Sequence, residues 1–283
     1  MYTLVHYFQQ HGMLRKSVWC FPCNRTYTLV KYKGSVTGYN LRCPGCRNRT
    51  SLQLDSFLDG AHVPLAKLLS LLYFCASGTG VTQTVHHLGC SSETVVQWYQ
   101  YFRDICLWKL LNTPVKLGGP GKTVEIDESV MVKAKYHRGH QLTMPQRWVF
   151  GVYDPETKLG YIELVTKRDA ATLLPIIQRV VEPGTTIWSD EWAAYGQLSS
   201  LGYTHSTVNH SRNIKDPITG TCTNHVAAYW CAVKRRFKKM TGTYPDMVPS
   251  HLDEHMWRKR FGRTPQLALL NLQCHIAERY PLA

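Results

Sequence analysis

Two segments that end in acidic residues decide the fold of this chain: Thr123-Val-Glu-Ile-Asp-Glu128 and Thr185-Thr-Ile-Trp-Ser-Asp-Glu191. Each is rich in β-branched and aromatic residues, as strands are. The sequence between them predicts two more strands, at Trp148–Asp154 and Tyr161–Val165, and then a helix over Asp169–Val180. Such an alternation of strands and helices indicates an α/β domain.

The acids at the ends of these strands predict a metal site. The predicted order is strand, strand, strand, helix, strand, helix, which is the order of an RNase H-like domain. In that fold the first and fourth strands lie side by side, so Asp127 and Asp190 come within reach of shared divalent cations. Carboxylate oxygens suit Mg²⁺ or Mn²⁺, and two such ions stabilise the attacking and leaving oxygens in phosphoryl transfer. A lone acid after a strand is usually a surface residue, but this pair favours catalysis.

The composition points to a polyanionic partner. The chain has 283 residues, with 33 Lys and Arg against 19 Asp and Glu, a formal charge of +14 and a pI near 9.4. This excess favours nucleic acid first and an acidic membrane second. The most apolar stretch, 65–76, contains Lys67 and is shorter than the roughly 20 residues that span a bilayer. We therefore expect a soluble, intracellular protein without a membrane partner.

Two cysteine pairs predict a zinc ribbon over residues 1–60. The pairs are Cys20-Phe-Pro-Cys23 and Cys43-Pro-Gly-Cys46, and the segment between them is β-prone. Each pair forms a tight turn that directs two thiolates to one point, and four thiolates satisfy tetrahedral Zn²⁺. We expect one structural zinc ion per chain; two disulfides or free thiols are the alternative. The basic residues of this region either contact phosphates or form a solvated surface.

Residues 61–112 predict a helix-turn-helix region. An apolar helix is expected over 65–74, a second helix over 81–88 that ends at Gly89, and a third that begins at Ser91 or Ser92. A short helix, a glycine turn and a helix with a polar face are typical of this motif. The residues expected to face the major groove are Thr94, Gln97, Gln100 and Arg103. A purely structural helical bundle is the alternative.

The rest of the chain divides into a linker and two further regions. Proline and glycine cluster at 112–122, which we interpret as a linker. The predicted RNase H-like domain follows at 120–245, and a C-terminal helical extension occupies 246–283.

A run of ordered motifs over about 120–263 resembles the Merlin group of eukaryotic DNA transposons and its bacterial insertion-sequence relatives. The motifs are VEIDES, KYHRGH, WVFGVYD, LLPIIQRVVEPGTTIWSD, YTHSTVNHSRNIKDPITG, VKRRFKK and HLDEHMWRKRFG. The zinc ribbon and helical region are in keeping with that group.

The resemblance implies a DDE transposase in which Asp127 is the first acid and Asp190 the second. The third acid of the family is a Glu on the helix after Thr223-Asn224, separated from the second by thirty-six residues. That spacing falls on Ala227. The family pattern is Thr-Asn-x-Ile-Glu-x-x-Trp, and here it is Thr223-Asn-His-Val-Ala-Ala-Tyr-Trp230. The surrounding anchors are present and the carboxylate is not.

Three explanations of Ala227 compete. The first is an engineered Glu→Ala change that traps a DNA complex, and the second is natural loss in a domesticated copy. The third is a substitute ligand, with Asn224 nearby on the same helical face and Glu254 as a remoter candidate. Loss of one ligand of three should severely impair phosphoryl transfer while sparing DNA binding.

Basic residues near the acids are candidate contacts to the DNA backbone. Four follow the first acid in a predicted hairpin: Lys133, Lys135, Arg138 and His140. Three more candidate contacts belong to the helix of the third acid: Asn224, Lys234 and Arg235. The basic run from Lys234 to Lys239 is also a weak nuclear localisation signal, and we expect the nucleus as the location.

The sequence therefore predicts a cut-and-paste DNA transposase that recognises terminal inverted repeats and joins them to target double-stranded DNA. By family analogy it acts as a homodimer or a higher synaptic assembly. The alternative is a domesticated, non-catalytic DNA-binding protein derived from a transposase. A nuclease of the RNase H type fits the fold but leaves the N-terminal regions without a task.

Overall fold

The computed structural model describes residues 2–131, 147–208, 221–240 and 243–282. They form two compact units. Unit 1 comprises residues 1–109 and 261–283, and unit 2 comprises residues 110–260. The predicted divisions at 60, 112 and 245 are finer than these units and stay predictions.

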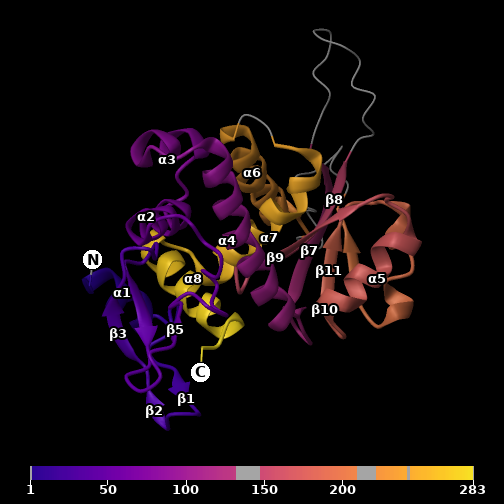
Figure 1. Ribbon diagram of the computed structural model, residues 1–283. Helices are drawn as coiled ribbons and strands as arrows, with labels where there is room; N and C mark the ends of the chain where they lie inside the picture. The colour runs from indigo at the N-terminus through magenta and orange to yellow at the C-terminus, as the bar shows by residue number, and fades with distance from the viewer. Residues whose placement is uncertain (1, 132–146, 209–220, 241–242, 283) are drawn as a thin grey trace. The chain divides into compact units, whose positions relative to one another are not determined.

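Unit 1 begins with a helix and a set of short antiparallel strands (Figure 1). The elements are α1 (Tyr2–Gln10), β1 (Trp19–Cys20), β2 (Arg25–Thr26), β3 (Thr28–Lys31), β4 (Tyr39–Arg42) and β5 (Arg49–Thr50). β1 pairs with β2, and β3, β4 and β5 form a three-stranded sheet in that order. The first cysteine pair therefore spans the end of β1 and the turn that leads to β2, and the second pair directly follows β4.

The helices of unit 1 are α2 (Leu65–Ala76), α3 (Val81–Leu88), α4 (Ser92–Asn112, whose last residues enter unit 2) and α8 (Pro265–Arg279). The three helices predicted for 61–112 are confirmed. α3 ends at Gly89, whose φ of 56° suits the left-handed helix cap that glycine adopts at little cost. α8 packs against α2, so the predicted C-terminal extension is divided between the two units. Within the described ranges, no helix has the length and apolarity that crossing a bilayer requires.

Unit 2 is built on a five-stranded sheet of order β12-β11-β7-β8-β9. Its strands are β7 (Thr123–Val130), β8 (Trp148–Asp154), β9 (Leu159–Val165), β11 (Thr186–Ser189) and β12 (Thr204–Thr207). β7, β8 and β9 are antiparallel, whereas β11 is parallel to both β7 and β12. The predicted strands and their order are confirmed, with β12 as an addition. A mixed sheet of this order has the RNase H-like arrangement.

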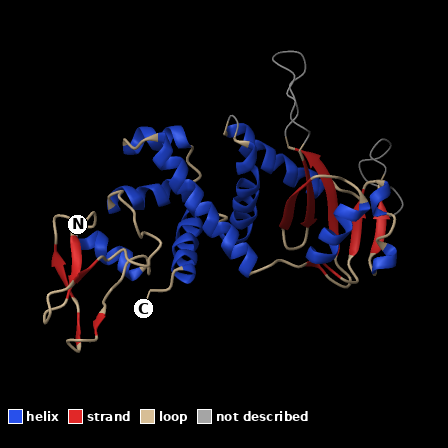
Figure 2. Cartoon of the chain, turned by 45° about the vertical axis from the view of Figure 1, so that its right-hand side comes forward, coloured by secondary structure: helices blue, strands red, loops and turns tan. Residues whose placement is uncertain are grey.

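Helices cover both faces of this sheet (Figures 1 and 2). α5 (Ala170–Val180) packs on one face, where its apolar side contacts Val124 and Ile126 of β7 within one core cluster. α6 (Asn224–Lys239) and α7 (Val248–Phe261) pack on the other face around Val149 and Ile162. The two clusters follow from the alternation of side chains along each strand.

A glycine allows α6 to lie close to the sheet. A Cβ atom at Gly151 of β8 would lie 2.5 Å from the ring of Trp230, which belongs to α6. Only a residue without a side chain accommodates this ring against the strand. Trp230 is 3% exposed and is therefore a core residue, as is the fully buried Trp257.

The proline- and glycine-rich segment 112–122 is not a separate linker. β6 (Leu117–Gly118) pairs in parallel with β10 (Val181–Glu182), and Leu117 is buried. The segment therefore belongs to unit 2. Three short 3₁₀ helices complete the described elements: η1 (Ala193–Tyr195), η2 (Ser199–Leu201) and η3 (Pro245–Met247).

Candidate active site

A buried carboxylate fixes the start of α6 against β7. Glu125 is fully buried, and its carboxylate accepts hydrogen bonds from the backbone N–H groups of His225 and Val226, both at 2.9 Å. The ring Nδ1 of His225 lies 2.6 Å from the other carboxylate oxygen. An anion at a helix N-terminus satisfies N–H groups that have no partner within the helix. The oxygen atoms of Glu125 are thus occupied, although a cysteine, Cys222, also lies within 4.8 Å.

The same face of β7 contacts α6 further along. Asp127 is two residues after Glu125, and the indole of Trp230 lies near its carboxylate, where it opposes the rise in pKa that burial causes. Two residues on again, the hydroxyl of Ser129 lies 2.6 Å from Nζ of Lys234. α6 therefore runs alongside β7, and its residues meet successive side chains of one strand face.

Three carboxylates converge at the end of the β7–β11 pair. Oxygen atoms of Asp127, Glu128 and Asp190 all lie within 4.8 Å of one another. The ladder between β7 and β11 stops at Glu125 and Trp188. Beyond that point no described strand pairs with β7 on the β11 side. Asp127 and Glu128, which start on opposite faces of β7, can therefore both approach Asp190 at this open edge.

Burial and mutual repulsion perturb these acids. Burial, reinforced by the charge of Asp190, raises the pKa of Asp127 to about 6. Burial also raises the pKa of Glu128 to about 7, with contributions from Asp190 and Asp127, while Tyr195 and Arg168 act in the opposite direction. Strongly shifted acids in one cluster are typical of functional sites.

Two buried polar side chains lie toward this cluster. Tyr195 is 0% exposed and Trp230 is 3% exposed. Neither the hydroxyl of Tyr195 nor Nε1 of Trp230 has a hydrogen-bond partner of normal geometry within the described residues. The charges of Glu128, Asp190 and Asp127 all raise the pKa of Tyr195, after burial as the main cause. The protein therefore holds donors in place beside the acids and leaves carboxylate oxygens available to a further ligand.

Ala227 lies on the α6 face that contacts β7. Positions three and seven residues further along the helix are Trp230 and Lys234, which meet Asp127 and Ser129. Ala227 itself is exposed. A longer acidic side chain at this position would have open space in which to extend beside the cluster.

The four cysteines of unit 1 also converge. The Sγ atoms of Cys20, Cys23, Cys43 and Cys46 lie within 4.8 Å of one another. Those of Cys20 and Cys46 are 3.6 Å apart, and no disulfide joins cysteines within the described residues. Burial would raise the pKa of Cys43, but backbone hydrogen bonds from Cys46 and Gly45 outweigh it and lower that pKa to about 6.

The predicted DNA-facing residues of α4 differ in exposure. Gln97 is exposed and Thr94 half-buried, with the Thr94 backbone N–H capped by Ser91. Arg103 is 5% exposed, and its guanidinium donates to Oε1 of Gln100, whose amide in turn donates to an aspartate. The prediction that Arg103 faces DNA is corrected: it is a packing residue, because the helix turns this position inward.

The remaining basic candidates fall into two groups. Lys133, Lys135, Arg138 and His140 lie outside the described residues. Asn224 and Arg235 are exposed on α6, whereas Lys234 is half-buried against β7. The charge of Lys234 opposes the rise in the pKa of Asp127 that burial causes.

Sequence reasoning did not assign three residues of this site: Glu128, Glu125 and Tyr195. Adjacent residues of a strand point to opposite faces, which argues against Asp127 and Glu128 meeting. The signal that was present is the pair of adjacent acids at a strand end. For Glu125, the signal is an acid between two apolar strand residues, Val124 and Ile126.

The family comparison agrees with this geometry. Residues 116–260 match the family model of the ISXO2-like transposase domain, of the IS1595 group. The match covers slightly more than half of the chain, so the chain belongs to the ISXO2-like transposase family. A curated relative, the uncharacterized transposase-like protein of Haemophilus influenzae, is 29% identical over 98 residues, which is 35% of this chain and 78% of that protein.

Solved structures of viral integrases are also similar. The integrase catalytic core of HTLV-2, solved with magnesium, is 12% identical, with 49% of this chain and 84% of that chain covered and a TM-score of 0.32. The catalytic core of BIV integrase is 14% identical, with 46% and 80% covered and a TM-score of 0.30. A chain of the simian T-cell lymphotropic virus intasome is 14% identical, with 68% and 67% covered and a TM-score of 0.33.

Proposed function

We propose that this chain is a cut-and-paste DNA transposase of the Merlin group, with its catalytic centre at the carboxylate cluster of unit 2. The observation that carries the proposal is the convergence of Asp127, Glu128 and Asp190 at the end of two parallel strands. Acids from distant segments gather there in a basic chain of a transposase family. In this proposal the chain binds terminal inverted repeats, cleaves DNA and joins the ends to target DNA.

The acids fit a pair of divalent cations of the Mg²⁺ or Mn²⁺ type. The donors are all carboxylate oxygens, which hard cations prefer. Burial first, and the neighbouring acids second, raise the pKa values of Asp127 and Glu128, and a bound cation would offset both. When bound, the cations supply electrophilic stabilisation to the attacking and leaving oxygens of an in-line displacement. Trp230 and Tyr195 line the buried side of the acid cluster, and Lys234 places a positive charge near Asp127.

Ala227 removes the third carboxylate that the family resemblance places on α6. We therefore propose that the catalytic centre is assembled but impaired in this chain. Asn224 remains available as a substitute because it is exposed one turn earlier on α6. Glu254 does not: it is 4% exposed and forms ion pairs with Arg236 and Arg258. An engineered change and a natural loss both remain compatible with this arrangement.

We propose that unit 1 recognises DNA. Four convergent thiolates without an open position suit one structural Zn²⁺, which would hold β1–β2 to β3–β5 as a zinc ribbon. α3, the turn at Gly89 and α4 have the order of a helix-turn-helix, with Gln97 exposed on the second helix. Such a helix would contact base edges, and the basic residues around it would contact phosphates.

We further propose a homodimeric or higher synaptic assembly in the nucleus. Two transposon ends must be processed together, which one copy of the site cannot do. The second candidate function, a domesticated DNA-binding protein without catalysis, is favoured by Ala227 alone.

The decisive experiment restores the missing acid. The variant Ala227→Glu and the matched control Ala228→Glu add the same charge at adjacent exposed positions, but only position 227 lies on the face that meets Asp127. Each variant is assayed for end cleavage of a duplex carrying the element's terminal repeats, with Mg²⁺ or Mn²⁺, and for Mn²⁺ binding by calorimetry.

We expect Ala227→Glu to raise cleavage by roughly 100-fold or more and to tighten Mn²⁺ binding, because one positioned group is worth about that much in catalysis. Ala228→Glu should change neither. Full cleavage by the unaltered chain would refute the assignment of position 227. A failure of Ala227→Glu in both assays would favour the non-catalytic candidate.

A further inference from the structure

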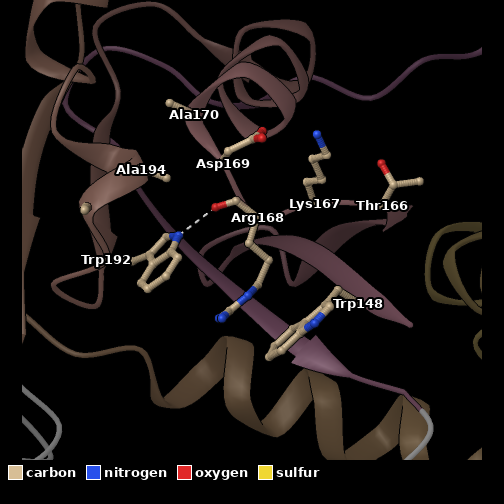
Figure 3. A pocket seen from close by; sticks show the side chains of 9 residues that line it. Trp148, Thr166, Lys167, Arg168, Asp169, Ala170, Trp192 and Ala194 are labelled. Atoms are coloured by element: carbon tan, nitrogen blue, oxygen red, sulfur yellow. Dashed lines mark hydrogen bonds between the residues drawn. The ribbon is translucent and has the colours of Figure 1, made fainter. Parts of the chain in front are cut away.

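A cleft of about 600 Å³ opens beside the acid cluster of unit 2 (Figure 3). Its lining comes from the segment after β9 and the segment after β11, with Trp148 at the start of β8. This cleft is distinct from the acid cluster itself, since none of the three acids lines it.

The centre of the cleft is a stack of two indoles and one guanidinium. The guanidinium carbon of Arg168 lies 3.7 Å from the ring centroid of Trp148 and 4.6 Å from that of Trp192. Figure 3 shows the Arg168 side chain extending between the two rings. Such cation–π stacks favour Arg because its planar guanidinium can lie on aromatic faces.

Trp192 is rigid and yet exposed. Its Nε1 donates to the backbone carbonyl oxygen of Arg168 at 2.8 Å, and its backbone N–H donates to Oδ1 of Asp190 at 3.1 Å. Nevertheless Trp192 is 40% exposed. A large aromatic residue that is held in position and still presents surface to solvent is prepared for a planar ligand, since ordering it on binding costs little further entropy.

The cleft is electrostatically suited to DNA and connected to the acids. Arg168 supplies a positive charge at the centre of the cleft. Lys167 is exposed at the rim and adds a second positive charge. The one acid of the lining, Asp169, is occupied as the N-cap of α5, because its carboxylate accepts from the backbone N–H and hydroxyl of Thr172.

We infer that this cleft binds an unpaired nucleobase of the DNA strand that lies at the acid cluster, with the base stacked on Trp192 and its flanking phosphates against Arg168 and Lys167. The inference rests on the proposed function, because it is the acid cluster that brings the DNA strand here. Stacking on an aromatic face tolerates any base, so the cleft positions the strand and does not read its sequence.

The test measures binding of a short oligothymidylate to the full chain by fluorescence anisotropy, without added Mg²⁺ or Mn²⁺. The variants are Trp192→Ala and Trp192→Phe, with Tyr244→Ala as a control because Tyr244 is an 82% exposed aromatic of the same unit. A second measurement locates the contact: a 5-iodouracil oligonucleotide is photocrosslinked and the attachment point is mapped by mass spectrometry. The melting temperature of each variant reports on folding.

We expect Trp192→Ala to weaken oligothymidylate binding by about 5- to 150-fold, the fold-change that corresponds to roughly 1–3 kcal/mol of base stacking. Trp192→Phe should retain most of the affinity, Tyr244→Ala should bind as the parent does, and the crosslink should map to Trp192. Unchanged binding by a folded Trp192→Ala variant would overturn the inference and make the stack a structural clamp only, as would a crosslink confined to other residues.

The proposed function fails separately. It would be contradicted by Mn²⁺ binding that Asp190→Asn does not weaken, a result that leaves the oligothymidylate assay unaffected. Arg168→Lys adds a further distinction, because it keeps the charge but loses the planar stack. If the cleft only attracts phosphate, Arg168→Lys and Trp192→Ala should both bind as the parent does, which would also overturn the stacking inference.

Discussion

The cysteine cluster of unit 1 and the acid cluster of unit 2 gather metal-binding side chains in opposite ways. The cysteine cluster takes four thiols from two short turns, and a four-thiolate site is complete when one ion is bound. The acid cluster takes three carboxylates from strands far apart in sequence, which repel one another and lie beside donors that have no partner among the described residues. The first arrangement uses metal binding to hold a small fold together. The second arrangement holds mutually repelling carboxylates together at a cost in stability, as a site that binds a ligand would.

The largest expected effect is loss of metal from the cysteine cluster. Cys43→Ser should abolish zinc binding and unfold the β1–β5 region, since structural zinc contributes on the order of 10 kcal/mol to such sites. The measurement is zinc content by elemental mass spectrometry together with limited proteolysis between residues 19 and 50. Cys274→Ser is the control, because Cys274 is exposed and outside the cluster. A metal-free Cys43→Ser variant that resists proteolysis would contradict the stabilising role of metal at the cysteine cluster.

The second effect concerns Glu125, which stabilises the fold although it lies on the same strand as Asp127 and Glu128, whose charges oppose folding. Glu125→Gln should reduce the free energy of unfolding by about 2 kcal/mol, because hydrogen bonds to a charged group contribute about 1.5–3 kcal/mol and the new amide would face N–H donors. Chemical denaturation measures the change. Glu156→Gln, at an exposed turn, should be neutral. A neutral Glu125→Gln would remove the distinction between structural and functional acids on β7.

The two clusters also differ in how far sequence alone predicts them. Cysteine pairs at short spacing carry their own geometry, so their spacing alone groups Cys20, Cys23, Cys43 and Cys46. The central strands are predictable because their composition and alternation are local. The contribution of Glu128 is not, because it depends on the β7 ladder with β11 ending several residues before the β7 ladder with β8.

The local sequence also does not predict which face of a helix is buried. Arg103 and Gln100 belong to a helix whose polar residues suggest a DNA-facing surface, yet they bond to each other and to Asp104 within unit 1. The proline- and glycine-rich segment 112–122 has the composition of a linker but supplies β6, whose partner β10 lies more than sixty residues away. For segment 112–122 the outcome depends on a tertiary partner that the local sequence does not indicate. For α4 the bonds are local, and what the sequence does not indicate is that packing in unit 1 buries Arg103.

A third prediction concerns a buried histidine of unit 2 outside the acid cluster, whose titration should make stability depend on pH. Burial, together with the charges of Arg236 and Lys259, lowers the pKa of His255 to about 3, and its Nε2 has no hydrogen-bond partner within the described residues. Because the unfolded chain binds this proton near pH 6.5, stability is present above that pH and is lost as pH falls toward 3. Between about pH 6.5 and 4.5 the loss should be on the order of 2 kcal/mol.

The measurement is the free energy of unfolding against pH for the parent and for His255→Phe, which should lose most of this slope. Asp253 has the opposite sign, because burial raises its pKa to about 6 and its protonation stabilises the fold as pH falls. Asp253→Asn should therefore steepen the net loss at acid pH. If His255→Phe leaves the slope unchanged, acid sensitivity comes from other groups.

The smallest expected effect is also the most direct test of strain in the acid cluster. At about pH 8, above the raised pKa values of Asp127 and Glu128 and with no divalent cation added, Asp190→Asn should raise the free energy of unfolding by about 1 kcal/mol. The sign follows from the raised pKa values: an acid whose pKa is higher in the folded state opposes folding once it is ionised, and removing its charged neighbour relieves part of that cost. The same variant should bind Mn²⁺ more weakly than the parent.

A gain in stability combined with a loss of cation affinity is the signature of a site whose charge is kept for a ligand. The Cys43→Ser variant should show the reverse combination, with loss of both zinc and stability. The control is Glu191→Gln, which removes the same charge one residue further along and outside the cluster. If Asp190→Asn instead destabilises unit 2, the Asp190 carboxylate stabilises the fold and does not oppose it. The acid cluster would then be structural, like the cysteine cluster.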